Sequence, residues 1–551
     1  MKAKKMSLFL VMILALSTFL AACSGDDSSS GNGEGGGSTE GVEQVLNVVE
    51  TSEIPSMDTA LATDSVSFNV MNNVMEGLYR LGENDEVVDG VAEGDPEVSE
   101  DGLTYTFKLR EDAKWSNGEP VTAHDFVYAW QKAVNPDTAA QYAYMLYVIE
   151  NGQEINSGEK EISELGVKAI DDNTLEVKLA NAVPYFKSLL SFGTFMPQNQ
   201  KFVEEQGDKY GLEADTTIYN GPFTLSEWKH EESFKLSKNP EYWDKDAVKL
   251  ETVNFKIVKD TNTAVNLYET GKIDRVGLSA ENVDTYKDSE EFLTENDTSV
   301  FYLEYNTENE ILSNAKIRKA LTMAFDKEAF VDTLLNNGST AAYYIVPKDF
   351  YTTQDGKDFR DVNGDMLKTN KEEAAKLWAE GLKELGTDKV ELELLNYDGD
   401  SAKKMGEYLK EQMETTLEGL TLSLNQQPFQ NKLDVQAKGD FDISYSGWGP
   451  DYQDPMTFLD MFTTGNGNNH TAYSSKEYDK LIKDASTTLL DDLEARDAAM
   501  AEAEKLLIEE DTVIAPLYQR GSSFLMKDKV KGLLSHSFGG DYSYKWVSIE
   551  E

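Results

Sequence analysis

The chain has 551 residues, 40% of them hydrophobic, which is too long for one ordinary domain and predicts two or three large cores. Its formal net charge is −49, and such a field repels nucleic acid and anionic lipid head groups, so no nucleic-acid partner is expected. A single cysteine excludes an internal disulfide and a metal site built from several cysteines. We interpret the acidity as a solubility feature, with steering of cationic ligands as the alternative.

The N-terminus has the pattern of a cleaved secretory leader. Three lysines precede an apolar run over residues 8–20, which is too short for a membrane span and has the wrong flanks. The segment Leu20-Ala21-Ala22-Cys23 then resembles the lipobox of bacterial lipoproteins. We therefore expect residues 1–22 to be a signal peptide and Cys23 to carry lipid on its sulfur. A plain secretory leader with a chance cysteine is the alternative.

The stretch after Cys23 has the composition of a flexible tether. Residues 24–43 are rich in Ser, Gly, Asp and Glu and contain almost nothing apolar, so they cannot form a core. We expect residues 23–44 to hold a folded body off a membrane surface.

The first half of the folded sequence predicts mixed α/β structure. Thr122, followed by Asp125 three residues later, has the pattern of a capped helix start, and Asn135-Pro136 ends that helix. Alternating apolar residues predict strands. These strands are expected over residues 45–49, 103–109, 175–179 and 253–257.

The second half alternates helices with strands, which is typical of βα units and a parallel or mixed sheet. One helix is expected to follow Ser313, another to close at Asn337-Gly338, and a third to end at Gly386. A further helix is expected over residues 405–413, and strands over 390–394 and 420–424.

Several patterns that could signal a catalytic or metal site are weak here. The four histidines, His124, His230, His470 and His536, lie far apart without a His-x-x-x-His pair. The stretch from Asp361 to Asp365 resembles part of a calcium loop, but its Gly is misplaced and the closing Glu is missing, which favours a polar turn. No Gly-x-Ser-x-Gly appears. We expect no metal, no cofactor and no enzymatic activity.

The most informative stretch runs from Gly447 to Pro455, directly after an alternating strand over residues 441–445. We expect the strand to break at the glycines, which allow close backbone approach, and to deliver Asp451 beside the rings of Trp448 and Tyr452. A carboxylate held there suits a bound cation. Taken alone, the pattern is more typical of a strand that ends in a turn with a solvated aspartate.

This stretch resembles the Gly-Trp-x-Ala-Asp-Tyr segment of the periplasmic oligopeptide-binding proteins, the solute receptors of ABC peptide importers, with Pro450 in place of the usual Ala. Further matching segments follow in order along the chain. They are residues 113–118, 121–130, 183–186, 220–223, 239–244 and 316–321.

The resemblance implies an α/β, bilobed periplasmic-binding-protein type II fold with an extra inserted domain, mixed sheets and a hinge between the lobes. Lobe 1 is then discontinuous and lobe 2 continuous. The implied boundaries are 45–75, 198–300 and 519–551 for lobe 1, 76–197 for the inserted domain and 301–518 for lobe 2.

By the same resemblance, Asp451 pairs with the free α-amino group of a peptide. The other peptide-binding residues implied are Gly447, Trp448, Gly449, Tyr445, Phe429, Thr63, Ser65 and Tyr142. Tyr445 and Gln436 stand where better-studied members have arginines, and Tyr445 replaces one that can serve the carboxylate end of short peptides. The preferred peptide length is therefore left open.

The function implied is capture of oligopeptides outside the membrane and delivery to an ABC permease with its ATPase subunits. The protein is expected to be a monomer, anchored by lipid on Cys23 to the extracytoplasmic face of the cell membrane of a Gram-positive bacterium. Two alternatives remain. One is a surface lipoprotein enzyme acting on peptides or peptidoglycan stems. The other is a related receptor for a signalling peptide, a dipeptide, nickel or haem.

Overall fold

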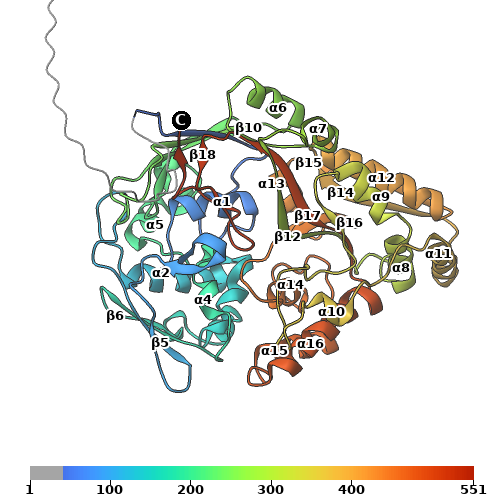
Figure 1. Cartoon of the computed structure of the whole chain (residues 1–551). Helices are drawn as coiled ribbons and strands as arrows, with labels where there is room; N and C mark the ends of the chain where they lie inside the picture. The colour runs from blue at the N-terminus through green and yellow to red at the C-terminus, as the bar shows by residue number, and fades with distance from the viewer. Residues whose placement is uncertain (1–40) are drawn as a thin grey trace, which may run out of the picture. The chain divides into compact units, whose positions relative to one another are not determined.

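The computed structural model describes residues 41–551 (Figure 1). The expected signal peptide, Cys23 and the tether as far as residue 40 lie outside the described residues. Among residues 41–551, no helix combines the length and the apolar character needed to cross a membrane.

The second half of the chain contains a seven-stranded mixed sheet. Its strand order is β11-β17-β12-β16-β14-β15, with β13 paired to β17. Strand β14 runs parallel to β15 and β16, whereas β12 is antiparallel to β16 and β17. The mixed sheet predicted from the sequence is therefore confirmed. The strands are β11 (Arg275–Gly277), β12 (Phe292–Tyr305), β13 (Thr340–Ala341), β14 (Val390–Tyr397), β15 (Leu420–Gln427), β16 (Ile443–Trp448) and β17 (Ile514–Met526).

The first half contributes two four-stranded sheets, with orders β1-β10-β9-β8 and β4-β5-β7-β6, and three short two-stranded pairs lie in the first half and near the C-terminus of the described chain. The first sheet has strands β1 (Val45–Glu50), β8 (Phe223–Lys229), β9 (Ser233–Lys238) and β10 (Thr252–Ile257). The second has β4 (Glu97–Val98), β5 (Thr104–Lys108), β6 (Val167–Asp171) and β7 (Thr174–Lys178). The pairs are β2 (Tyr79–Leu81) with β3 (Val87–Asp89), β18 (Val530–Lys531) with β21 (Ser548–Ile549), and β19 (Leu534–Ser535) with β20 (Tyr542–Ser543).

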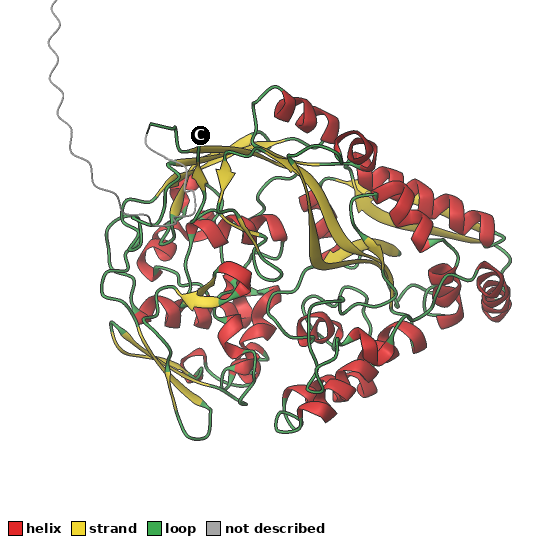
Figure 2. Ribbon diagram, in the orientation of Figure 1, coloured by secondary structure: helices red, strands yellow, loops and turns green. Residues whose placement is uncertain are grey.

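Helices surround these sheets (Figure 2). Helix α2 begins with a capping box between Thr122 and Asp125, and α11 ends at Gly386 with φ 71°, both as predicted. Helix α12 packs on β14 and β15. The helices are α1 (Ser65–Val74), α2 (Ala123–Val134), α3 (Gly152–Asn156), α4 (Phe186–Leu189), α5 (Gln200–Gln206), α6 (Thr261–Glu269), α7 (Ala280–Tyr286), α8 (Ala315–Met323), α9 (Lys327–Phe330), α10 (Arg360–Asn363), α11 (Lys371–Leu385), α12 (Asp400–Thr416), α13 (Phe429–Ala437), α14 (Met456–Leu459), α15 (Lys476–Ser486) and α16 (Leu493–Lys505).

The long strands β12 and β17 contain the expected boundaries between lobe 1 and lobe 2. They pair along most of their length, with register shifts between Asn296 and Val300 and again between Phe301 and Tyr302. The lobe boundaries expected from the sequence, 300/301 and 518/519, fall inside these two continuous strands. A hinge there would bend paired strands at an irregular point of their ladder.

The buried apolar residues form three clusters within the described part of the chain. The largest contains the core of the first half together with residues from α14 to α16. A second lies on the seven-stranded sheet around residues such as Trp378 and Leu422, and a small third one packs around Tyr268. Two of these clusters are large, and two or three large cores were predicted from chain length.

Candidate functional site

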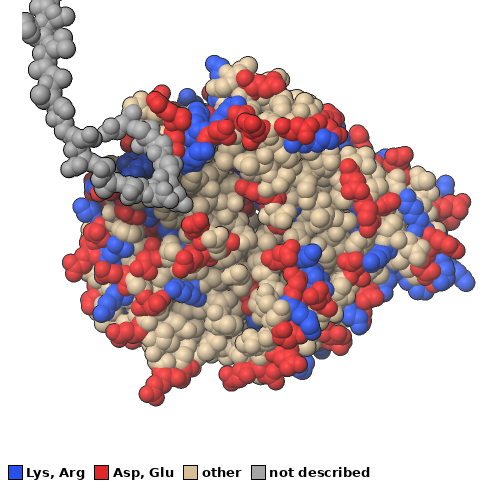
Figure 3. Space-filling model, in the orientation of Figure 1, with Lys and Arg blue, Asp and Glu red and all other residues tan. Residues whose placement is uncertain are grey.

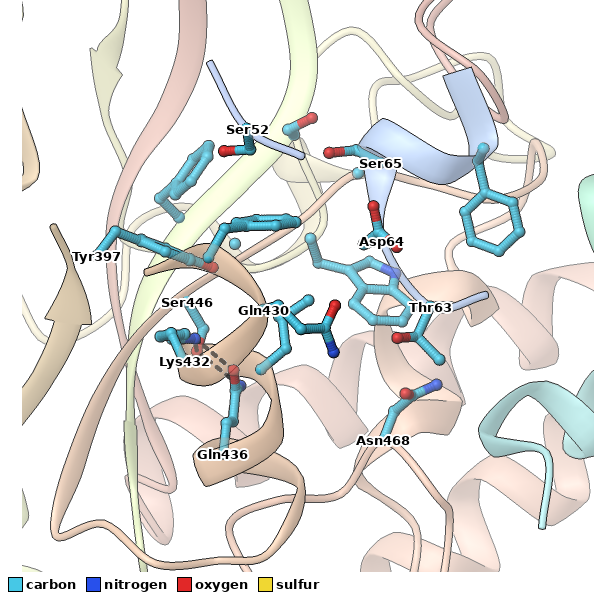
Figure 4. A pocket seen from close by; sticks show the side chains of 18 of the residues that line it. Ser52, Thr63, Asp64, Ser65, Tyr397, Gln430, Lys432, Gln436, Ser446 and Asn468 are labelled. Atoms are coloured by element: carbon cyan, nitrogen blue, oxygen red, sulfur yellow. Dashed lines mark hydrogen bonds between the residues drawn. The ribbon is translucent and has the colours of Figure 1, made fainter. Parts of the chain in front are cut away.

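A cavity of about 580 Å³ is lined by residues from both halves of the chain (Figure 4). Its size falls in the range of small-molecule and peptide sites. Eight of the nine binding residues expected from the sequence line it: Thr63, Ser65, Tyr142, Phe429, Gly447, Trp448, Gly449 and Asp451.

Asp451 is the most unusual group in this cavity. The residue is only 5% exposed, and its Oδ2 has no hydrogen-bond partner. Its Oδ1 accepts a hydrogen bond of 3.4 Å from the phenol of Tyr142, and its backbone N–H donates to Thr457. Burial, reinforced by nearby Asp460, raises the pKa of Asp451 well above the usual value. An apposed cation would reverse this shift and complete its hydrogen bonding.

Aromatic rings surround this carboxylate. The Tyr142 ring stacks on Trp448 with ring centroids 6.1 Å apart. It also stacks on Tyr144, with ring centroids 5.8 Å apart. Elsewhere on the wall, Phe429 stacks on Tyr397 at 5.7 Å. These rings give the cavity apolar surfaces with polar edges, which suit ligands with varied side chains.

Strand β16 differs from the expectation at its end. It does not break at Gly447 but continues through Trp448, with Gly447 paired to Phe301 of β12. A Cβ at Gly447 would lie 2.6 Å from the Phe301 ring, so the glycine is needed for this ring to lie flat on the strand.

Tyr445, the ninth expected binding residue, is not among the residues that line the cavity. It is 3% exposed, and its phenol lies 2.6 Å from that of Tyr518 in the core of the seven-stranded sheet. The Phe301 ring stacks on it at 5.7 Å and lines the cavity itself. Because side chains alternate along a strand, Tyr445 shares its face with Gly447 and with the paired Phe301, and the Phe301 ring covers it.

Thr63 and Ser65 flank the start of helix α1. Asp64 caps this helix by accepting 2.8 Å and 2.7 Å hydrogen bonds from the backbone N–H and the hydroxyl of Ser67. Burial raises the pKa of Asp64 to about 6. The cap fixes the backbone at this point of the cavity wall.

Sequence reasoning missed a cluster of buried polar side chains, which we call the Glu304 cluster and define as Glu304, Lys432, Gln436, Ser446 and His470. All five line the cavity. The amide of Gln436 donates to Glu304 Oε2 at 2.6 Å and to Ser446 at 2.9 Å, and Ser446 donates to Glu304 at 3.1 Å. Figure 4 shows Lys432 pointing toward Gln436 and Ser446, with both of which it is hydrogen-bonded. These residues come from separate segments of the chain, so no local sequence pattern predicts the cluster.

Two further carboxylates follow Asp451 in sequence and have different surroundings. Asp454 is buried and accepts two hydrogen bonds, of 2.9 Å and 2.8 Å, from the guanidinium of Arg496. Asp460 accepts from the phenol of Tyr452 at 3.1 Å, and burial raises its pKa to about 8. Asp454 is thus a structural ion-pair partner, while Asp451 has no cation beside it among the described residues.

Within residues 41–551, no group of three or more His, Cys, Asp or Glu side chains is arranged to hold a metal ion. The polar groups around the cavity instead hydrogen-bond one another or, as at Asp451 Oδ2, Trp448 Nε1 and Asn468 Nδ2, have no partner. The arrangement is that of a binding cavity with unsatisfied hydrogen-bonding groups on its wall.

The fold and the cavity between segments of the two halves define a bilobed solute-binding protein of the type II class. The family model for bacterial extracellular solute-binding proteins, family 5 (middle region), matches residues 86–470. The chain belongs to this family.

Two relatives illustrate the similarity. The dipeptide-binding protein DppE of Bacillus subtilis is 37% identical over 529 residues, which cover 96% of each chain. The crystal structure of the substrate-binding domain of an oligopeptide ABC transporter from Bacillus anthracis is 47% identical, with a TM-score of 0.91 over 93% of this chain and 99% of that one.

A third relative distinguishes two conformations. The murein tripeptide-binding protein MppA of Escherichia coli, 27% identical, superposes with a TM-score of 0.84, over 93% of this chain and 100% of that one. The unliganded open form of MppA gives only 0.61, with 93% and 98% covered. The lobes of the present structure therefore have an arrangement unlike that open form.

Proposed function

We propose that this protein is an extracytoplasmic receptor that captures peptides in the cavity between its lobes and delivers them to an ABC permease with its ATPase subunits. The observation that carries the proposal is the buried Oδ2 of Asp451, which lines the cavity without a partner. A peptide α-ammonium supplies both the counter-charge and the hydrogen-bond donors that this carboxylate needs.

The peptide backbone must also be satisfied once it is buried. The amides and carbonyls of an extended peptide could pair with the protein backbone at the end of β16, around Gly447 and Gly449, and near Thr63 and Ser65. Such pairing satisfies the peptide backbone without selecting particular side chains. The aromatic walls would then accept varied side chains. Broad specificity follows from this division of roles.

Closure of the lobes is the second part of the proposed mechanism. The backbone N–H of Gly539 donates to the carbonyl of Pro450 at 2.9 Å, and Tyr185 stacks on Tyr452 at 4.8 Å. Pro450 and Tyr452 are the sequence neighbours of Asp451, so a ligand bound to Asp451 would favour the closed state by holding this segment in place. The closed shape is what we expect the permease to recognise.

The names of the relatives support peptides as the ligand class, because DppE is a dipeptide-binding protein, the Bacillus anthracis structure belongs to an oligopeptide transporter, and MppA binds murein tripeptides. A surface enzyme acting on peptides remains the rival from another class, and it predicts turnover of a bound peptide instead of stoichiometric capture.

We further propose that the protein is a monomer anchored through lipid on Cys23 to the outer face of the cell membrane of a Gram-positive bacterium. The leader and the lipobox-like segment before Cys23 support the anchor. Acidic side chains are spread over the visible face of the molecule and not gathered in one patch (Figure 3), which fits a solubility role for the charge. Replacing Cys23 with Ser should release the protein or leave it unprocessed, and normal processing with retention at the membrane would contradict the anchor.

Mass spectrometry of ligands released from the denatured, purified protein tests the proposed function. We expect intact peptides at about one per protein, which also reveals their length. Recovery of cleavage products accumulating with time would favour the enzyme instead. A nickel ion, haem or one single signalling peptide would indicate the specialised receptors considered above.

A further inference from the structure

The Glu304 cluster ends at the cavity in an imidazole that has no hydrogen-bond partner. Both ring nitrogens of His470 are unpartnered, and Glu304 Oε1 lies 3.7 Å from Nδ1, beyond hydrogen-bond length. The side chain is only 15% exposed and lines the cavity. An imidazole carries at least one N–H in either protonation state, so a donor is left unsatisfied at this wall.

A second donor lies two residues away in the same loop. Asn468 is 3% exposed, lines the cavity, and its Nδ2 has no partner. The backbone N–H of His470 donates to the carbonyl of Asn468 at 3.0 Å, which fixes the two residues relative to each other. Two neighbouring donors without acceptors indicate that a ligand supplies acceptor oxygens here.

The charges of the cluster favour an anionic acceptor. Glu304 is its single acid, whereas Lys432 and His470 are two bases. Lys432 is fully buried and has no carboxylate within 4.0 Å in the described part of the chain, and burial lowers its pKa to about 8. Burial would raise the pKa of Glu304, but His470, Lys432 and Ser446 together bring it below the usual value. Glu304 is thus held as a carboxylate beside the His470 ring.

We propose that His470 and Asn468 form a carboxylate subsite of the cavity. His470 would turn Nδ1 toward Glu304 and donate from Nε2 to one oxygen of the ligand, and Asn468 would donate from Nδ2. Lys432 contributes only through its charge, because it is covered by Gln436 and Ser446. Together with the unpaired acid at Asp451, the cavity then complements a ligand with an ammonium and a carboxylate.

This inference rests on the proposed function and goes beyond it by assigning recognition of a negative charge. The carboxylate has two sources, the C-terminus of a short peptide or the side chain of Asp or Glu within a longer one. Both share the same chemistry. The source follows from the peptide panel described next.

Calorimetric titration of the wild-type protein with two sets of peptides tests the subsite. One set comprises alanine peptides of two to six residues, each with a free or an amidated C-terminus. The other comprises amidated peptides with Glu or Gln at each position in turn. We expect at least a tenfold preference for the carboxylate in one pair of either set, and the pair identifies the source.

The variant His470→Gln keeps a hydrogen-bond donor but cannot be charged, and it should lose most of this preference while still binding the uncharged peptide. The control His124→Gln changes a histidine that is 65% exposed and does not line the cavity, and it should keep the preference. Asn468→Ala should reduce it.

Equal binding of every carboxylate and amide pair by the wild type overturns the subsite and leaves peptide capture intact, and this outcome does not depend on whether a variant folds. Equal losses for both members of a pair in His470→Gln would also overturn it, since that result indicates a purely structural residue. No binding of any peptide by the wild type overturns the proposed function and the subsite with it.

Discussion

The phenol of Tyr142 lies 3.4 Å from Oδ1 of Asp451, although the two residues are 309 positions apart in sequence. Tyr142 belongs to the first half of the chain, and Asp451 is the third residue after strand β16 in the second half. The hydrogen bond therefore joins two parts of the molecule at the group that we expect to bind the ligand ammonium. It leaves Oδ2 free for that purpose.

Replacing Tyr142 with Phe should weaken peptide binding about three- to tenfold. The phenol orients the Asp451 carboxylate for the ligand. A hydrogen bond to a charged group contributes about 1.5 to 3 kcal/mol, and we expect only part of this energy to be missing from the complex, because the ligand itself then binds Asp451. Calorimetry measures the effect. Tyr147→Phe is the control, because Tyr147 donates to Asn156 at 2.7 Å away from the cavity. Equal losses in both variants would contradict the role given to Tyr142.

Gly447→Ala should lower both stability and peptide affinity. Its Cβ would lie 2.6 Å from the Phe301 ring, so the ring must move and reshape the cavity wall. Gly277→Ala is a matched control in the same sheet, since nothing lies within 4 Å of a Cβ there. Thermal unfolding and peptide titration of the two variants give the comparison. If Gly447→Ala and Gly277→Ala gave the same melting temperature and the same peptide affinity, the role given to the Gly447–Phe301 contact would be wrong.

Asp454→Ala should destabilise the fold by about 3 to 5 kcal/mol, because it leaves the buried guanidinium of Arg496 unpaired. By contrast, Asp451→Asn removes a buried acid that has no cation beside it and should leave stability unchanged or higher. Urea unfolding of the peptide-free proteins distinguishes them. Similar losses for both would show that the two carboxylates are not as different as their surroundings indicate.

The pH dependence of stability should change when Asp460 is replaced with Asn. Burial raises the pKa of Asp460 to about 8, whereas an unfolded Asp titrates near about 3.9. Between these values the folded protein keeps a proton that the unfolded chain loses, so this group's contribution to stability falls as the pH rises through that window. Asp460→Asn should therefore gain most in melting temperature at pH 8 and least at pH 5. A gain that does not depend on pH would rule out this titration.

Much of the local structure could be predicted because its causes are local. Alternating residues predicted β5, β7 and β10, and the pair Thr122 and Asp125 predicted the start of α2. Gly386 marked the end of α11, since a left-handed residue there satisfies the last carbonyls of the helix. The class of fold came from resemblance, as periodicity does not reveal how distant segments combine.

The features that could not be predicted depend on partners far away in the chain. Strand β16 continues through Gly447 because Phe301 pairs with it, and Tyr445 is buried because Tyr518 and Phe301 cover it. The ion pair of Asp454 with Arg496 and the Glu304 cluster likewise join separate elements. Side chains brought together only by folding leave no spacing in the sequence to detect.

The central claim is that Asp451 binds the α-ammonium of a peptide. A double-mutant cycle tests it with wild type and Asp451→Asn, each titrated with a free and an N-acetylated form of a peptide recovered from the protein. Asp434→Asn is the control, because Asp434 is an exposed carboxylate that also lines the cavity.

We expect acetylation to cost the wild type and the Asp434→Asn control about 3 to 5 kcal/mol, since it leaves a buried charge without its partner. It should cost Asp451→Asn far less, because the group that the ammonium would meet is already neutral. Losses that simply add across the cycle would contradict the pairing of Asp451 with the peptide N-terminus.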